Sequence, residues 1–177
     1  MIPDAKKEEF RVETYKRQDN YEGVTAFKRI LNYYIDYEYR EDAIDAIASS
    51  LGYQFKAKDF YVSMESLEEM KNEGMIVGSH TDSHPVMSKL NTKQQKIELE
   101  TSFSVLCNLT EPRNLTYCHP YGGFHSFNED TVDLLNKMGV KYSFNVEARD
   151  IASEDWLHSK QSLPRYDCNL FQHGEAS

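Results

Sequence analysis

The residues best suited to chemistry are two histidines four positions apart, His80 and His84, in the stretch GSHTDSHP at residues 78–85. Two imidazoles at this spacing within one turn can point at a common centre, as metal ligands do. Thr81 stands where the helical zinc-protease motif has a Glu, so that motif is absent. The spacing therefore predicts either a divalent-metal site or a solvated loop that carries two surface histidines.

A second stretch that could take part in catalysis is HPYGG at residues 119–123. Its glycines leave backbone N–H groups unobstructed, and such groups beside a metal ion can stabilise the oxyanion of an acyl-transfer intermediate. The alternative is an ordinary β-turn with Pro at its start and Gly where φ is positive. The order of the two stretches favours the functional interpretation, provided that the fold brings them together.

Apolar patterning indicates which elements would position these stretches. Helices are expected at residues 24–35, 40–51, 63–74, 91–106 and 128–138, and strands at 75–78, 115–118, 140–146 and about 162–166. Alternation of strands and helices at these distances predicts a right-handed parallel α/β arrangement. In such a fold the loops after residues 78, 118 and 146 gather at the carboxyl ends of the strands.

Composition limits the classes of function. The formal net charge is -9 and the pI is near 5.1, so nucleic-acid binding has no electrostatic support. No apolar run approaches the ~20 residues of a membrane span. Cys107, Cys118 and Cys168 have no metal-site spacing and suggest free thiols in a reducing compartment. We therefore expect a cytoplasmic location, on the condition that no N-terminal signal has been lost.

The two stretches in this order resemble the polysaccharide deacetylases, also known as the NodB homology group or carbohydrate esterase family 4. The likeness runs from about residue 60 to 146 and more weakly to Arg165. It implies a distorted (β/α) barrel and metal-dependent removal of N-acetyl or O-acetyl groups from a carbohydrate, with zinc as the expected ion. Residues 1–59 would be a helical N-terminal segment or insertion, and residues 60–177 the deacetylase-like region of the same domain.

Carried over by position, His80 and His84 resemble the two metal-binding histidines of the family. Tyr121 resembles the residue whose backbone N–H contributes to the oxyanion hole, and Arg165 resembles a supporting arginine. His173 lies in about the region of the family's general acid, although its neighbours differ. No cofactor apart from the metal is expected.

The chain also departs from the family pattern. No apolar strand before residue 60 ends in the paired aspartates that supply the family's catalytic base and third metal ligand, and only about four strands are expected. Asp82 is a conceivable substitute base, but an Asp in a tight turn usually bonds locally. The simplest account is a chain that begins inside the domain, and we expect little activity from it alone.

A second interpretation belongs to a different class of protein. The chain would be a non-catalytic remnant or a carbohydrate-binding protein, in which Tyr117, Tyr121, Phe124 and Phe127 stack on sugar rings. At their spacing, most such aromatic residues would instead belong to the core. Metal content separates the two interpretations, because a remnant should bind zinc weakly or not at all.

Overall fold

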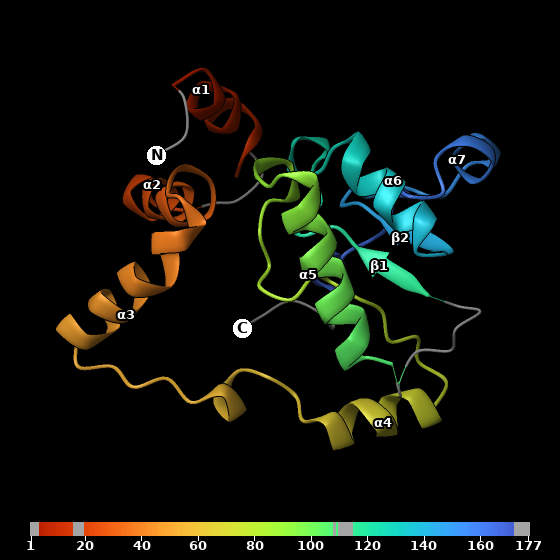
Figure 1. The fold of residues 1–177 in the computed structure, drawn as a ribbon, viewed down its shortest axis with the longest axis horizontal. Coiled ribbons are helices and arrows are strands. Elements are labelled where there is room, and N and C mark those ends of the chain that lie inside the picture. The colour runs from red at the N-terminus through yellow and green to blue at the C-terminus, as the bar shows by residue number, and fades with distance from the viewer. Residues whose placement is uncertain (1–3, 16–19, 108, 110–114, 172–177) are drawn as a thin grey trace. The chain divides into compact units, whose positions relative to one another are not determined.

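The computed structural model describes residues 4–15, 20–107, 109 and 115–171 (Figure 1). Internal contacts divide the chain into two compact units, Met1–Leu67 and Glu68–Ser177. Each unit is described by itself. The division lies inside one helix, α4 (Met64–Asn72).

The first unit is helical. It contains α1 (Asp4–Glu13), α2 (Glu22–Arg29), a π-helical turn (Ile30–Tyr34), α3 (Arg40–Ser50) and 3₁₀ turns at Tyr37–Tyr39 and Ala57–Asp59. Phe10 and Tyr33 are buried, with ring centroids 4.9 Å apart. The helices expected at residues 24–35 and 40–51 are confirmed, and the π-helical turn continues the first of them.

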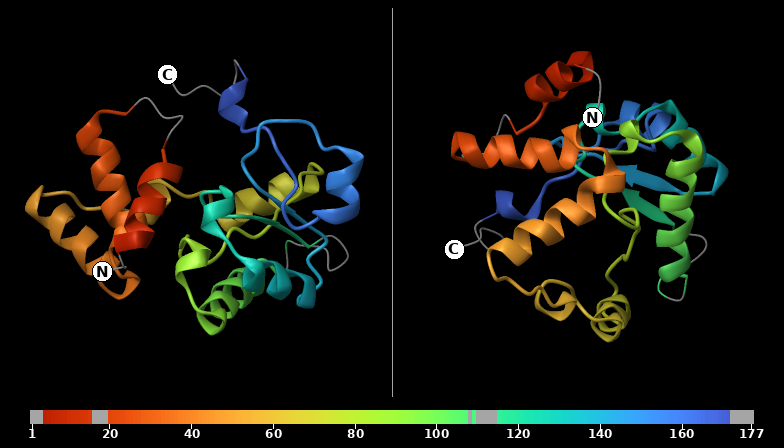
Figure 2. Two further views of the ribbon diagram at one scale, coloured as in Figure 1. Left: turned by 90° about the horizontal axis from the view of Figure 1, so that it is seen from above. Right: turned by 60° about the vertical axis from the view of Figure 1, so that its left-hand side comes forward.

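The second unit is built on a short parallel sheet. β1 (Thr116–Cys118) pairs in parallel with β2 (Tyr142–Phe144), so that Tyr117 lies opposite Ser143. Isolated parallel bridges add Ser79 beside Tyr117 and Leu163 beside Phe144. Four extended segments thus lie side by side in sequence order, and the predicted parallel α/β arrangement is confirmed within this unit (Figure 2).

The strand expected at residues 75–78 is not present. Met75 is 60% exposed and Ile76 is 76% exposed, and pairing with β1 begins only at Ser79. An apolar run shows that a segment would benefit from burial, but a strand also needs neighbours, and those are set by distant parts of the chain.

Two longer helices cover the sheet, α5 (Thr92–Val105) and α6 (Glu129–Lys137). Each begins with a capping box, at Asn91 and Asn128, and Gly139 follows α6 at φ 77°. The expected helix boundaries are confirmed within one or two residues. The sequence pattern did not indicate α7 (Ser153–His158) or the 3₁₀ turns at Met87–Lys89, Phe124–Ser126 and Cys168–Leu170.

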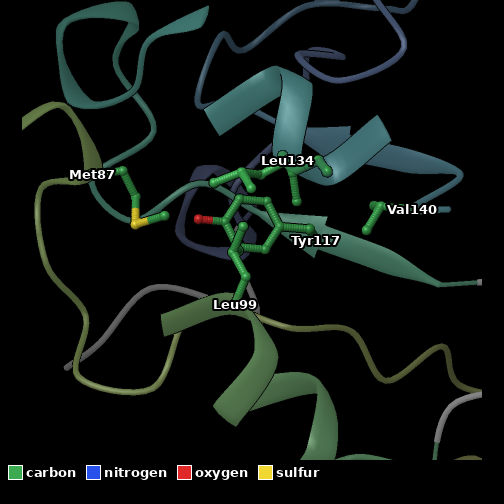
Figure 3. Packing of buried hydrophobic residues seen from close by; sticks show 6 residues of the cluster. Met87, Leu99, Tyr117, Leu134 and Val140 are labelled. Atoms are coloured by element: carbon green, nitrogen blue, oxygen red, sulfur yellow. The ribbon is translucent and has the colours of Figure 1, made fainter. Parts of the chain in front are cut away.

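The core lies between these helices and β1. Its buried members, drawn as sticks in Figure 3, come from α5, β1, α6 and the segments before α5 and after α6: Met87, Leu99, Tyr117, Leu134, Leu135 and Val140. A buried polar contact adds to the packing, since Thr131 of α6 donates to the Gln95 side chain of α5 at 2.6 Å. The sheet edge that carries the candidate site is therefore backed by a packed layer.

Among the residues that the structure describes, no helix is long and apolar enough to cross a membrane.

Candidate active site

The segment that carries the first histidine lies directly against β1. Ser79 donates its backbone N–H to the Thr116 carbonyl and accepts from Cys118 N–H, both at 2.9 Å. A Cβ on Gly78 would lie 2.5 Å from Thr116 Oγ1. Glycine at this position permits this close approach of two backbones.

The ring of His80 is fixed by the end of β1. Its Nδ1 lies 2.8 Å from the Cys118 carbonyl, which can only accept, so Nδ1 carries the proton and Nε2 keeps its lone pair. Desolvation of the ring lowers the pKa of His80; the carbonyl bond opposes this shift and the positive charge of Arg165 adds to it. A neutral imidazole with an oriented Nε2 is the form that binds metal ions.

The two histidines and Tyr121 meet at one place. The ring centroids of His80 and His84 are 4.7 Å apart, and those of His84 and Tyr121 are also 4.7 Å apart, both in edge-on geometry. The structure therefore brings together three of the five predicted site residues. They belong to two loops that follow neighbouring parallel segments, as the predicted topology requires.

Both loops contain residues in the left-handed region of backbone space. Thr81, His84 and Tyr121 have φ values of 69°, 54° and 62°. For non-glycine residues this conformation costs roughly 1–2 kcal/mol each. Such a conformation persists only where surrounding contacts fix it, so the loops must be held from outside.

Glu98 of α5 provides one such contact. Its Oε2 accepts from the backbone N–H groups of Asp82 and Ser83, at 3.0 and 2.9 Å, and its Oε1 accepts from the Ser83 hydroxyl at 2.7 Å. The sequence pattern around Glu98 does not indicate this role. Its position in the middle of a helix carries no local signal of a contact 15 or 16 residues away.

The Tyr121 turn is held by the segment after β2. Gly122 lies at φ 65°, and a Cβ there would lie 2.2 Å from Val146 Cγ1. Val146 donates its N–H to the Gly122 carbonyl at 3.3 Å. The turn expected from the sequence is present with Gly at positive φ, and Tyr121 shares that conformation.

Arg165 lies at the same end of the sheet and contacts a backbone carbonyl and a carboxylate. Its Nε donates to the Asn145 carbonyl at 2.9 Å, and its Nη2 lies 3.1 Å from Asp167. It also affects the pKa of His80 through charge. Arg165 therefore links the segment after β2 to the vicinity of the histidines. His173, the fifth predicted site residue, lies outside the described residues.

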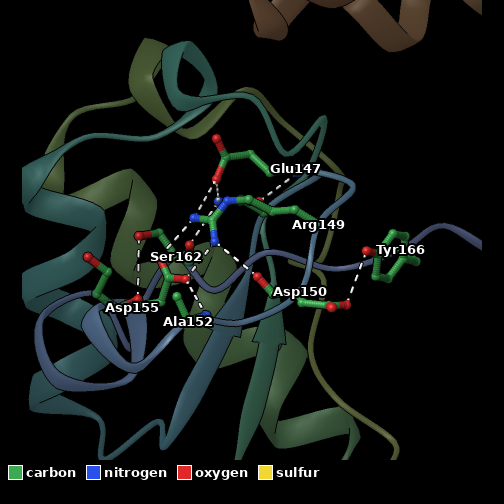
Figure 4. A network of polar contacts seen from close by, with 9 residues as sticks. Glu147, Arg149, Asp150, Ala152, Asp155, Ser162 and Tyr166 are labelled. Atoms are coloured by element: carbon green, nitrogen blue, oxygen red, sulfur yellow. Dashed lines mark hydrogen bonds and ion pairs between the residues drawn. The ribbon is translucent and has the colours of Figure 1, made fainter.

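The segment after β2 is stabilised by an ionic cluster (Figure 4). Arg149 bonds to both oxygens of Asp155, at 2.6 and 2.8 Å, and to Glu147 at 3.2 Å. The hydrogen bond from Arg149, with help from the Ala152 N–H, lowers the pKa of Asp155 to about 2. Tyr166 donates to Asp150 at 3.1 Å, which joins the final segment to this loop.

His119 is a core residue. It is 1% exposed, stacks on Phe127 at 3.7 Å between centroids, and donates from Nε2 to the Gln161 carbonyl at 2.7 Å. Its Nδ1 is buried and has no hydrogen-bond partner in the part of the chain that the structure describes. Burial lowers its pKa to about 4, so it is neutral near pH 7.

The hypothesis that Tyr117 stacks on a sugar ring is wrong. Tyr117 is 0% exposed and lies at the centre of the core. Strand β1 has the helices on one side, and alternation along the strand turns this ring toward them. Phe124, by contrast, is 58% exposed.

A complete metal site is not formed by the residues that the structure describes. No group of three or more His, Cys, Asp or Glu side chains among them could hold an ion. The donor chemistry of His80 and His84 fits two positions of a tetrahedral zinc site, which in catalytic zinc proteins has three protein ligands.

These features define an α/β protein whose candidate site is built from loops at the carboxyl ends of parallel strands. The sequence model of the family described as "Polysaccharide deacetylase" matches residues 50–143, more than half of the chain. The chain belongs to the polysaccharide deacetylase family. The family resemblance found in the two sequence stretches is thereby confirmed.

Two relatives share about 100 residues with the chain. An uncharacterized 30.6 kDa protein of Geobacillus stearothermophilus, from the fumA 3' region, is 32% identical over 56% of this chain and 36% of that protein. The "Putative polysaccharide deacetylase YxkH" of Bacillus subtilis is 25% identical over 57% of this chain and 33% of its own length. The aligned part thus spans about a third of each relative.

One solved structure supports the fold. The Streptococcus pyogenes deacetylase PplD, determined in complex with acetate, superimposes with a TM-score of 0.52 at 20% identity. The match covers 59% of this chain and 44% of that one. A distorted barrel was predicted. The described residues contain four parallel extended segments, which agree with a part of such a sheet and do not form a closed barrel.

Proposed function

We propose that this chain provides the metal-binding and oxyanion-stabilising part of a carbohydrate deacetylase. The reaction is hydrolysis of an N-acetyl or O-acetyl group on a carbohydrate, such as an acetylated aminosugar or polysaccharide. The main support is the meeting of His80, His84 and Tyr121 at the carboxyl ends of parallel segments. Membership of the polysaccharide deacetylase family supports the substrate class.

In this proposal His80 and His84 hold a divalent ion, with zinc as the first candidate. The bond from His80 Nδ1–H to the Cys118 carbonyl directs Nε2 outward, an arrangement common among metal-bound histidines. A bound divalent ion supplies a Lewis acid for the acetyl carbonyl and lowers the pKa of a coordinated water. Two protein ligands hold an ion less tightly than three, so we expect weak binding by these residues alone.

The chain's own residues have separate roles. The backbone N–H of Tyr121 donates to the oxygen that becomes negative when the acetyl carbonyl is attacked. Arg165 positions the loop after β2 through the Asn145 carbonyl. His173 is the proposed general acid that protonates the departing sugar group. No described carboxylate is assigned as general base.

Zinc binding tests the ligand assignment. Isothermal titration of the chain with zinc should give a measurable heat of binding. The zinc affinity should be at least tenfold lower in His80→Ala and in His84→Ala. His158→Ala is the matched control, because His158 is an exposed histidine on α7 whose partner is Glu154 at 3.7 Å. Wild-type affinity in both site variants would refute the assignment.

Acetate release tests the activity. With an acetylated aminosugar oligomer, we expect turnover near background with or without zinc, since general-base catalysis contributes roughly 10²–10⁴ in rate. Strong zinc-dependent turnover that His80→Ala abolishes would contradict this expectation. It would show that a carboxylate such as Asp82 acts as the base.

A further inference from the structure

The loop between the two histidines is attached to helix α5 by one side chain. Glu98 accepts three hydrogen bonds from Asp82 and Ser83, two of them from backbone N–H groups, at 2.7 to 3.0 Å. Asp82 and Ser83 lie midway between His80 and His84. A carboxylate can satisfy three donors at once, because each oxygen has two lone-pair sites.

The helix that carries Glu98 is well suited to hold a loop in place. α5 starts at a capping box, and Leu99, next to Glu98, is fully buried in the core. Four residues after Glu98, on the same face, the buried Ser102 hydroxyl bonds to Ser79 at 2.8 Å. Thus α5 holds the chain immediately before His80 and again two residues after it.

The backbone of the loop needs this support. Thr81 and His84, which flank the two residues bonded by Glu98, both have positive φ. Inside the loop, His84 N–H donates to Thr81 Oγ1 at 3.1 Å, which closes the turn but attaches it to no other element. Contacts to α5 therefore contribute to where the His84 ring lies relative to His80 and Tyr121.

We propose that Glu98 is a positioning residue that sets the mutual placement of the His80 and His84 rings. Without its carboxylate, Asp82 and Ser83 lose their acceptor, Thr81 and His84 relax toward ordinary backbone conformations, and the two rings separate. The value of this placement for metal binding rests on the proposed function, but the placement itself exists without a metal.

Ring-to-ring nuclear Overhauser effects in the metal-free protein test the placement directly. We expect the effects between His80 and His84, and between His84 and Tyr121, to disappear in Glu98→Ala. Amide hydrogen exchange at Asp82 and Ser83 should become at least tenfold faster. Glu100→Ala is the matched control, because Glu100 lies on the exposed side of α5 and pairs with Lys96 at 3.2 Å. It should leave all of these signals unchanged.

Glu98→Gln keeps the side-chain shape and one carbonyl acceptor, so it should restore part of the ring contacts and of the exchange protection. It also keeps the test decisive if the alanine variant fails to fold, since weakened ring contacts in a folded Glu98→Gln would support the proposal. The proposal would be overturned if both ring contacts persisted at full strength in folded Glu98→Ala. If the alanine variant does not fold, the same result in Glu98→Gln would overturn it.

Zinc titration of the same proteins separates this inference from the proposed function. If the wild-type chain binds zinc, Glu98→Ala should weaken binding by roughly 10–100-fold, as loss of an outer-sphere partner does. Unchanged affinity in that variant would count against Glu98. If the wild-type chain binds no zinc, the metal proposal fails, and the ring contacts alone decide the role of Glu98.

Discussion

At the scale of single residues, His119 couples folding to pH. Burial lowers its pKa from 6.5 to about 4, so the folded chain resists protonation while the unfolded chain accepts a proton below pH 6.5. The stability that depends on neutral His119 is therefore complete above about pH 6.5 and is lost as the pH falls toward 4. Linkage gives a loss of about 2 kcal/mol between pH 7 and pH 5.

Urea unfolding of the wild type and His119→Phe at pH 7 and pH 5 measures this contribution. Phenylalanine keeps a ring against Phe127 but cannot titrate. Between pH 7 and pH 5 the free energy of unfolding of the variant should therefore fall by about 2 kcal/mol less than that of the wild type. The variant is expected to be less stable at pH 7, since the Gln161 carbonyl loses its donor. Parallel losses in the two proteins would show that other groups control the acid response.

The residue scale also shows what a sequence can reveal of a site. His80, His84 and Tyr121 could be named as candidate site residues because their types and order carry information, and the fold brings their rings together. Glu98 could not be found, because its partners are 15 and 16 residues away and its own neighbours form an ordinary helix. Arg165 was found only through family likeness, and its bond to the Asn145 carbonyl depends on strand packing.

At the scale of elements, the turn after β1 depends on one glycine for two reasons. Gly122 has positive φ, and its α-hydrogen faces Val146 where a Cβ would lie 2.2 Å away. Gly139 also has positive φ, but nothing lies within 4 Å of a Cβ placed there. The two positions therefore separate backbone strain from steric exclusion.

We expect Gly139→Ala to cost about 1–2 kcal/mol, the strain of a left-handed alanine. Gly122→Ala should cost at least about 1 kcal/mol more, because Val146 must also move. Chemical denaturation of the two variants measures the difference. Equal losses would mean that the Val146 segment adapts freely to the turn. Zinc titration of Gly122→Ala then shows whether movement of this turn reaches His84.

The elements themselves were predictable to different degrees. The helices at α5 and α6 were located from capping residues and apolar spacing, which are local signals. The prediction of a strand at residues 75–78 is wrong because Met75 and Ile76 are exposed and pair with no extended segment among the described residues. Helix α7 is too short for periodicity. Its first turn carries the Arg149–Asp155 ion pair, which the sequence pattern did not indicate.

At the scale of the whole chain, exposed aromatic residues gather in the irregular segment between α3 and α4. Tyr53, Phe55, Phe60 and Tyr61 lie outside regular long helices and are each more than 60% exposed. Phe10 and Tyr117, by contrast, are fully buried, one in each unit. Exposed aromatic residues in an irregular segment are the preferred sites of chymotrypsin.

Limited chymotrypsin digestion followed by mass spectrometry should therefore cut first at Tyr21, which is 89% exposed, and between residues 53 and 61. A fragment that begins near residue 62 and contains α5, β1, α6 and β2 should then persist, because its core is packed. Cleavage at Tyr117 should appear only after unfolding. Early cuts within β1 or β2 would contradict the packed core of the second unit.

The contact from Glu98 has a consequence for protein engineering. It recognises the loop mainly through the backbone N–H groups of Asp82 and Ser83, which every amino acid except proline possesses. Position 82 is exposed, and no side-chain bond of Asp82 is needed for this contact. A library of substitutions at position 82 could therefore vary charge and size beside the two histidines while the loop keeps its shape. Proline is the exception, because it has no backbone N–H to donate to Glu98.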